Sequence, residues 1–214
     1  MLLGSAVSIF LLRKESHMQT PLPYTPFVME ETFAGIQSVD ARDHMLANRK
    51  LELTGPIDEA SSSALVRSLL FLQESDPHKP ATLYINSPGG EVHSGLALYD
   101  VMQAVSFPVH TVCVGMAASM AAIIFVSGSE RSMLPHSMVM IHDPLIDGGL
   151  GGSALSVKAK ADTLMRTRDI TASILAHHTG LSTEKVLELT SKDTYFDAEE
   201  AIQAGISDHI ARSL

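Results

Sequence analysis

Segments patterned as strands alternate with segments patterned as helices through most of the chain, and this alternation limits the fold more than any other feature of the sequence. Strands are predicted over residues 49–54, 81–87, 109–115 and 137–141. Helices are predicted over 59–75, 91–105, from near Met116 onward, 154–177, 182–191 and 197–204, with N-caps at Asp58, Ser182 and Asp197. The alternation predicts an α/β fold, with helices packed on a largely parallel sheet.

Charge and cysteine content exclude several classes of function. The formal net charge is −9, and a chain without a basic excess cannot neutralise phosphates, so we expect no nucleic-acid partner. Cys113 is the single cysteine, so an internal disulfide is impossible, which fits a reducing compartment such as the cytoplasm. The sequence contains neither CxxC nor HExxH, so no metal site is predicted.

The first residues stand apart from this pattern. The apolar stretch over 2–12 is too short to span a bilayer, and Arg13 and Lys14 follow it instead of preceding it as in a signal peptide. Residues 16–18 resemble a cloning scar. We therefore treat residues 1–25 as an N-terminal extension, either a leader or an artificial addition, and we expect no membrane partner.

A single hydroxyl, that of Ser119, interrupts the apolar run over 112–125. Ser119 follows a predicted strand and opens a predicted helix, where free backbone N–H groups and the helix dipole can stabilise an oxyanion. We expect Gly115 to permit the turn and the nearby alanines to leave room for a substrate. The alternative is a small residue at a close helix contact, and the GxSxG pattern of α/β-hydrolases is absent.

A nucleophilic serine needs a base, and the base needs an orienting group. His142 follows a predicted strand, where ligand sites gather, although it could also be an ordinary loop histidine. Asp193 and Asp143 are both candidates for the orienting carboxylate, although neighbouring side chains such as those of 142 and 143 usually diverge. The turn NSPGG over 86–90 exposes backbone N–H groups, as an ordinary turn also does.

These pieces together resemble one family. The segments LYINSPGG, GMAASM, MIHDP, HTG and DAEEAIQAGISDHI occur in the order and approximate spacing of the caseinolytic protease proteolytic subunit, ClpP, and FVMEET resembles its N-terminal segment. The resemblance covers about residues 26–210. It implies a ClpP/crotonase-like fold of repeated strand–helix units with a long handle helix, forming one serine peptidase domain over 26–214.

The resemblance also implies a role for each matching residue. Ser119 in GMAASM would be the nucleophile, His142 the general base and then acid, and Asp193 the residue that orients His142. Gly90 and Met120 would donate backbone N–H groups to the oxyanion. The substrate would be bound as an added strand by a glycine-rich segment that contains Gly148, Gly149, Leu150, Gly151 and Gly152.

Family members assemble as stacked heptameric rings, and an AAA+ unfoldase that uses ATP feeds them polypeptide substrates. The resemblance therefore implies self-association through the handle helix, unfoldase docking near Leu70 and Tyr84, and no cofactor in this chain. The sequence has no P-loop, which agrees with a subunit that binds no nucleotide.

The sequence departs from the family pattern at several positions. Asp143 stands where the family generally has glutamine, and Lys192 stands where an arginine that helps to pair the rings is common. Lysine lacks the bidentate fork of arginine, which puts ring pairing in doubt. Thr82 and Ala104 replace aromatic residues of the docking cleft, which suggests weaker docking, a different unfoldase or a mixed ring with a second ClpP paralogue.

Other classes of function remain open at this stage. One is a non-catalytic or partner-activated subunit of a mixed ring, although the three triad positions are intact. Another is a crotonase-like acyl-CoA enzyme, which would use carboxylates instead of a serine nucleophile. A Ser-Lys signal-peptide peptidase would need a lysine base and a membrane anchor, and a binding module would leave the spaced triad unexplained.

Overall fold

The computed structural model describes residues 26–33, 35–146 and 151–213. The chain divides into two compact units, Met1–Lys50 and Leu51–Leu214. The boundary predicted after residue 25 falls inside the first unit, and the single domain predicted over 26–214 stays a prediction.

The described part of the first unit is a hairpin followed by a short helix. Strands β1 (Phe27–Thr32) and β2 (Gly35–Asp40) pair in antiparallel register, and α1 spans Ala41–Ala47. The carboxylate of Asp40 caps this helix by accepting a hydrogen bond of 2.8 Å from the N–H of Arg42. The sequence analysis did not predict these three elements.

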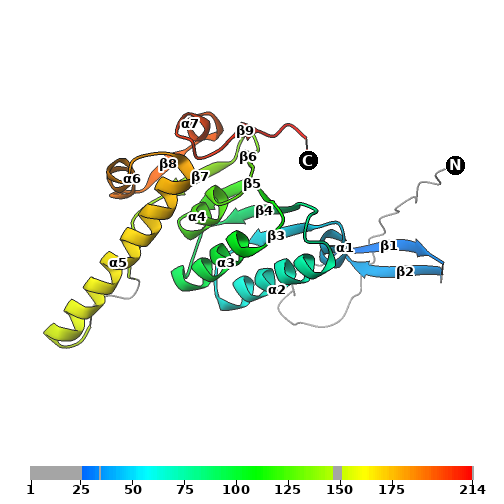
Figure 1. Ribbon diagram of the computed structural model, residues 1–214, viewed down its shortest axis with the longest axis horizontal. Helices are drawn as coiled ribbons and strands as arrows, with labels where there is room; N and C mark the ends of the chain where they lie inside the picture. The colour runs from blue at the N-terminus through cyan, green and yellow to red at the C-terminus, as the bar shows by residue number, and fades with distance from the viewer. Residues whose placement is uncertain (1–25, 34, 147–150, 214) are drawn as a thin grey trace, which may run out of the picture. The chain divides into compact units, whose positions relative to one another are not determined.

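The second unit is built on a seven-stranded sheet, shown in Figure 1. Its strands are β3 (Lys50–Thr54), β4 (Ala81–Ser87), β5 (Val109–Ala118), β6 (Arg131–Met133), β7 (Met138–Ile141), β8 (Thr194–Phe196) and β9 (His209–Ile210). The first half of β5 pairs in parallel with β6 and its second half pairs in parallel with β7, whereas β7 and β8 are antiparallel. The predicted α/β fold with a mostly parallel sheet is confirmed.

Six helices accompany this sheet in the described part of the second unit. They are α2 (Glu59–Ser75), α3 (Val92–Ala104), α4 (Met120–Val126), α5 (Ala154–Thr179), α6 (Thr183–Thr190) and α7 (Ala198–Gln203). In Figure 1, α2, α3 and α4 lie over the same face of the sheet. The predicted caps are confirmed, because the side chains of Asp58, Ser182 and Asp197 each accept a hydrogen bond from a first-turn N–H.

The boundary between β5 and α4 differs from the prediction. The helix was expected from near Met116, but β5 continues to Ala118 and α4 begins at Met120. Gly115 therefore lies within the strand and does not form the turn. The pairing of β4 with β5 shifts register here, and the side chain of Asn86 accepts a hydrogen bond of 3.2 Å from the N–H of Met116. A Cβ on Gly115 would lie 2.7 Å from Asn86 Oδ1, so the glycine makes space for this side chain.

Helix α4 forms the centre of the core. All of its residues are buried, and a helix that is apolar on every side is one that the rest of the protein surrounds. Phe125 and Ile124 are fully inaccessible to solvent. The N-terminus of α4 is thereby fixed relative to the ends of β5 and β7.

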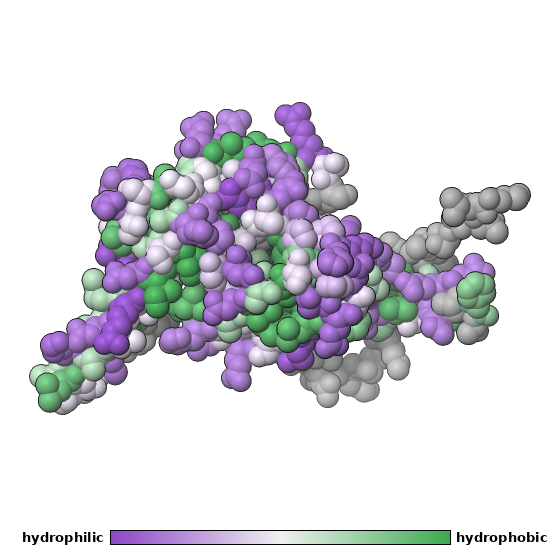
Figure 2. Space-filling view, viewed as in Figure 1, coloured by the Kyte–Doolittle hydropathy of each residue, from purple (hydrophilic) through white to green (hydrophobic). Residues whose placement is uncertain are grey.

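Helix α5 is packed at one end and exposed at the other. Its buried residues, Ala172, Ile174 and Leu175, lie in its last two turns, whereas Leu155 is 80% exposed and Met165 is 52% exposed. Figure 2 shows apolar surface at the free end of this helix among hydrophilic side chains. Of the helices in the described ranges, none is long and apolar enough to cross a membrane.

Arg131, at the start of β6, ties three segments of the second unit together. Its guanidinium donates hydrogen bonds of 2.8 Å to the carbonyls of His178 and Gly205, and it pairs with Asp208 at 2.5 Å. The hydrogen bond from Arg131 holds the pKa of the Asp208 carboxyl below its ordinary value. The end of α5 and the segment after α7 are thus held to the sheet by one side chain.

Asp208→Asn should destabilise the protein by about 1 to 2 kcal/mol at neutral pH, because it removes a charge-assisted partner of a well-buried guanidinium. Since the pKa of Asp208 is lower in the folded protein, its stabilisation is present above about pH 4 and is lost as the pH falls through the folded-state pKa. Denaturation of the parent and the variant should therefore differ at pH 7, and the difference should shrink as the pH falls through the folded-state pKa of Asp208. Glu188→Gln, which breaks the exposed pair with Lys185, is the control and should cost no more than about 0.5 kcal/mol. An equal effect of the two substitutions would contradict the argument.

Candidate active site

Ser119 occupies a sharp turn between β5 and α4. Its backbone has φ 55° and ψ −123°, a left-handed conformation that residues other than glycine rarely adopt. The N–H of Ser119 donates a hydrogen bond of 2.8 Å to the carbonyl of Met140, which continues the pairing of β5 with β7. The residues before the turn, Ala117 and Ala118, are buried, so the strained turn projects the serine hydroxyl from a packed support.

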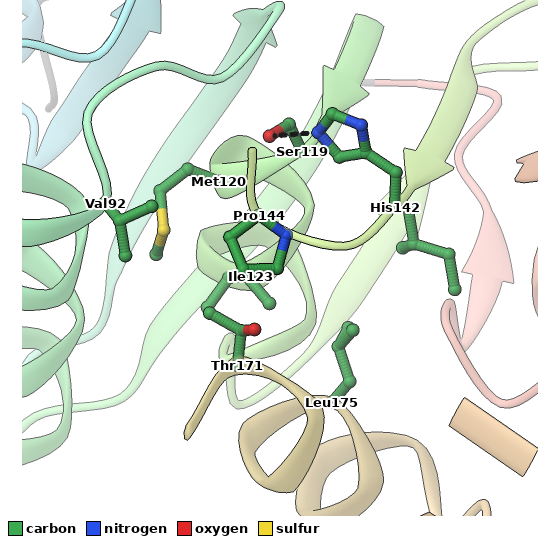
Figure 3. A pocket seen from close by; sticks show the side chains of 9 residues that line it. Val92, Ser119, Met120, Ile123, His142, Pro144, Thr171 and Leu175 are labelled. Atoms are coloured by element: carbon green, nitrogen blue, oxygen red, sulfur yellow. Dashed lines mark hydrogen bonds between the residues drawn. The ribbon is translucent and has the colours of Figure 1, made fainter. Parts of the chain in front are cut away.

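His142 lies beside this hydroxyl. Because β5 and β7 run in parallel with Ala118 opposite Met140, the residues that follow both strands meet at one edge of the sheet. His142 Nε2 lies 2.8 Å from Ser119 Oγ, as Figure 3 shows. A neutral imidazole with its proton on Nδ1 accepts the serine proton at Nε2, so this is the geometry of a nucleophile and its base.

Asp193 is the carboxylate that reaches the other side of the imidazole. It directly precedes β8, and β8 is antiparallel to β7 with Thr194 opposite Ile141, so Asp193 is brought beside His142. Asp193 Oδ1 lies 3.3 Å from His142 Nδ1. The His142 side chain is 17% exposed, whereas that of Asp193 is 60% exposed.

The rival carboxylate, Asp143, points elsewhere. Its Oδ2 atom lies 2.6 Å from Nε of Arg168 on α5, and its Oδ1 atom accepts a hydrogen bond of 2.6 Å from the hydroxyl of Thr190. The structure thus brings the carboxylate of Asp193, and not that of Asp143, beside His142. The orienting role of Asp193 stays a prediction. The sequence analysis gave no role to Arg168 or Thr190, whose contribution depends on packing between distant segments.

The turn after β4 lies against Ser119 through Gly89. A Cβ on Gly89 would lie 2.7 Å from Ser119 Cβ and 2.9 Å from the backbone nitrogen of Met120. Gly89, which the sequence analysis did not single out, is therefore what allows the close approach, and two consecutive glycines in NSPGG were the available signal.

The two backbone amides expected at the oxyanion site border this contact. Gly90 bridges Ile57, but the bridge uses the carbonyl of Gly89 and the N–H of Glu91, so the N–H of Gly90 faces away from Ile57. Met120 is the first residue of α4, where helical hydrogen bonding leaves the N–H groups without a partner. Gly90 and Met120 can thus present donors beside Ser119, and their role in catalysis stays a prediction.

A small cavity of about 30 Å³ opens beside the serine and the histidine. Its lining is mostly apolar and comes from α3, α4, β7, α5 and the segments that follow β5 and β7: Val92, Ser119, Met120, Ile123, Ile141, His142, Pro144, Thr171 and Leu175. Figure 3 shows this cavity from close by. A larger groove of about 590 Å³ shares Val92 and Pro144 with this cavity and continues along α5 to Ser156. The site therefore combines a candidate nucleophile with an apolar recess and an adjoining groove.

The other predicted site residues stand as follows. Gly148, Gly149 and Leu150 lie outside the described residues. Gly151 accepts a hydrogen bond of 3.1 Å from Lys160 Nζ at its carbonyl, and Gly152 has φ +126°, just before the N-cap of α5. Leu70 on α2 is 49% exposed and Tyr84 on β4 is partly exposed. Substrate binding by the glycine segment and unfoldase docking at Leu70 and Tyr84 stay predictions.

Within residues 26–33, 35–146 and 151–213, no group of three or more histidine, cysteine, aspartate or glutamate side chains could hold a metal ion.

Gly90→Ala should reduce turnover at Ser119 by about 10- to 100-fold, because misplaced catalytic groups lose rate steeply. A Cβ on Gly90 would lie 2.2 Å from the Ile57 carbonyl oxygen, so the turn that supports Ser119 must shift. Gly55→Ala is the matched control, since Gly55 also has a positive φ, of +79°, but a Cβ there meets nothing within 4 Å. Hydrolysis of a short fluorogenic peptide, with thermal unfolding in parallel, measures both. Equal rates for Gly90→Ala and the parent would contradict this assignment of the turn.

A comparison with known protein families identifies the family of this chain. The family model described as Clp protease matches residues 34–213, a range that contains Ser119, His142, Asp193 and the turn at Gly89 and Gly90. This match covers most of the chain and supports a ClpP-like peptidase. The chain therefore belongs to the Clp protease family.

Proposed function

We propose that this protein is the proteolytic subunit of an ATP-dependent protease, a serine endopeptidase that cleaves unfolded polypeptides and short peptides with Ser119, His142 and Asp193. The observation that carries the proposal is the distance of 2.8 Å between Ser119 Oγ and His142 Nε2, at a serine held in a strained strand-to-helix turn. Membership in the Clp protease family supports the same reaction class.

In the first half of the reaction, His142 Nε2 takes the proton of Ser119 Oγ while Oγ attacks the carbonyl carbon of the peptide bond. The carbonyl oxygen becomes an oxyanion, which the N–H groups of Gly90 and Met120 stabilise at the N-terminus of α4. Asp193 stabilises the imidazolium through Nδ1. When the C–N bond breaks, His142 returns its proton to the leaving amine, and the acyl group stays on Ser119.

In the second half, His142 takes a proton from water, and the resulting hydroxide attacks the acyl carbon. A second oxyanion forms in the same place and collapses, and His142 returns the proton to Ser119 Oγ as the carboxylic acid product leaves. The reaction consumes one water for each bond cleaved. The apolar cavity formed in part by Ile123 and Leu175 favours an apolar side chain beside the scissile bond.

We further propose that the chain works inside a ring of its own copies, with or without a second ClpP paralogue, in the cytoplasm. The exposed first half of α5, with Leu155 and Met165 open to solvent, supports a contact with other subunits. An AAA+ unfoldase would supply unfolded chains and consume the ATP, so this subunit needs no cofactor. Leu70 is the exposed apolar residue that we assign to unfoldase docking.

Treatment with a fluorophosphonate tests the nucleophile directly. The parent chain should gain the mass of one adduct, and Ser119→Ala should gain none and lose peptide hydrolysis by at least about 1,000-fold. Fold and assembly should be unchanged, because the substitution removes one hydroxyl without opening a cavity. Ser68→Ala, which removes an exposed hydroxyl on α2, should label as the parent does. An adduct on Ser119→Ala, or unchanged hydrolysis by it, would exclude Ser119 as the nucleophile.

Thiol reagents test the competing nucleophile, Cys113. This residue is fully buried in β5, and burial raises the pKa of its thiol to about 11. The native protein should therefore show no adduct with iodoacetamide at about pH 8 and should keep its peptidase activity. The unfolded protein should gain one adduct, because Cys113 is the single cysteine. Loss of activity together with an adduct on the native protein would contradict a serine mechanism.

A further inference from the structure

Asp143 makes three hydrogen-bonding contacts next to the candidate catalytic histidine. Its carboxylate contacts Arg168 Nε at 2.6 Å and the Thr190 hydroxyl at 2.6 Å, and its N–H donates to the carbonyl of Thr190 at 2.7 Å. We call Asp143, Arg168 and Thr190 the Asp143 clamp. Both oxygens of the Asp143 carboxylate thus make a contact, and Asp143 binds Thr190 at the side chain and at the backbone.

The clamp joins three elements that are far apart in the sequence. Asp143 belongs to the segment that follows β7, Arg168 lies in the middle of α5, and Thr190 ends α6. The side chains of Asp143 and Arg168 are 32% and 23% exposed, and Thr190 is buried. Such partly shielded, charge-assisted contacts are stronger than ion pairs on an open surface.

The same two segments carry the base and its orienting carboxylate. His142 precedes Asp143 directly, and Asp193 follows Thr190 by three residues. In the described part of the chain, the Asp193 carboxylate makes no hydrogen bond or ion pair other than the one of 3.3 Å with His142, and its side chain is 60% exposed. The position of this side chain therefore depends mainly on the path of residues 190–194.

That path is fixed on both sides of Asp193. The clamp holds Thr190 before it, and the hydroxyl of Thr194 donates a hydrogen bond of 2.6 Å to the carbonyl of Leu189 after it. Without the clamp, the link between the His142 segment and the Asp193 segment is the short pairing of β7 with β8. The segment that carries Asp193 is then held to the segment that carries His142 by this strand pairing alone.

We propose that Asp143 is a positioning residue of the peptidase site, which sets the distance between His142 and Asp193 by clamping Thr190 and makes that distance depend on the place of α5 through Arg168. The inference rests on the proposed function. Asp143 contacts neither the nucleophile nor the place of the scissile bond, so it acts through His142 and Asp193 alone.

Three substitutions weaken the side-chain contacts of the clamp and leave its backbone hydrogen bond in place. Asp143→Asn removes the charge and turns a donor toward Arg168 or Thr190, Thr190→Val removes the hydroxyl, and Arg168→Gln removes the guanidinium. Glu188→Gln is the matched control, because Glu188 also makes an ion pair, of 3.0 Å with Lys185, on the helix that Thr190 ends, and has no part in the clamp. All six proteins, including the parent and the double variant of Asp143→Asn with Arg168→Gln, are prepared as the full chain in its native assembly.

The readouts separate alignment from folding and from substrate binding. Fluorophosphonate is small and does not need the groove, so its rate of reaction with Ser119 measures activation of the serine. Misfolding lowers the fraction of chains that finally react, whereas misalignment lowers the rate at which every chain reacts. Short-peptide kinetics then divide any loss between kcat and KM.

We expect Asp143→Asn and Thr190→Val to lower the labelling rate and kcat by about 10- to 100-fold, with full final labelling and KM changed by less than about threefold. Glu188→Gln should match the parent. Asp143→Asn combined with Arg168→Gln should lose little more than Asp143→Asn alone, because the two residues act through one contact.

Labelling rates within twofold of the parent for both Asp143→Asn and Thr190→Val would overturn the inference and leave the proposed function intact. A lower final extent of labelling at an unchanged rate would also overturn it, since that result describes a folding residue. No labelling of the parent would overturn the proposed function, and the inference with it.

Discussion

The backbone of Ser119 is the constraint on which the rest of the site depends. A residue other than glycine at φ 55° costs about 1 to 3 kcal/mol, so the surrounding structure must hold it there. Three features do so: the hydrogen bond from its N–H to the carbonyl of Met140, the complete burial of α4 immediately after it, and the close approach of Gly89 from the turn after β4. The turn places Oγ at the edge of the sheet. Because α4 begins directly after the turn, the amide of Met120 lies at the N-terminus of this helix.

The parts of the fold that depend on local chemistry were predictable from the sequence. Apolar patterning located β3, β4 and β7, and the capping residues Asp58, Ser182 and Asp197 located the helices that they begin. The short strands β6, β8 and β9 were not predicted, because two or three residues carry no period and become strands only by pairing with a distant neighbour. The end of β5 was also misplaced, since Gly115 suggests a turn until the side chain of Asn86 is seen beside it.

The candidate site was also predictable from the sequence only in part. Ser119 and His142 could be placed together because each follows a strand of a parallel sheet, and the carboxyl ends of such strands share one edge. The orienting carboxylate could not be chosen, because the choice depends on the antiparallel pairing of β7 with β8 and on Arg168, which is 25 residues from Asp143. The family resemblance supplied Asp193, whereas the bare spacing left both carboxylates open. The side chain of Asp143, next to His142 in the sequence, thus points toward Arg168 on α5, and the side chain of Asp193, far along the chain, lies beside His142 instead.

Helix α5 joins this site to a surface that the chain does not cover by itself. Its last turns are packed and Thr171 and Leu175 line the cavity beside Ser119, while its first turns expose Leu155. A rigid helix transmits a displacement of its exposed end to Arg168, and Arg168 contacts Asp143 at 2.6 Å. If alignment of the triad depends on that contact, a neighbour that binds the exposed half of α5 more tightly in the aligned state must favour alignment. By the same linkage, occupation of the site would then strengthen the binding of that neighbour, and assembly and catalysis would be coupled through the contact of Arg168 with Asp143.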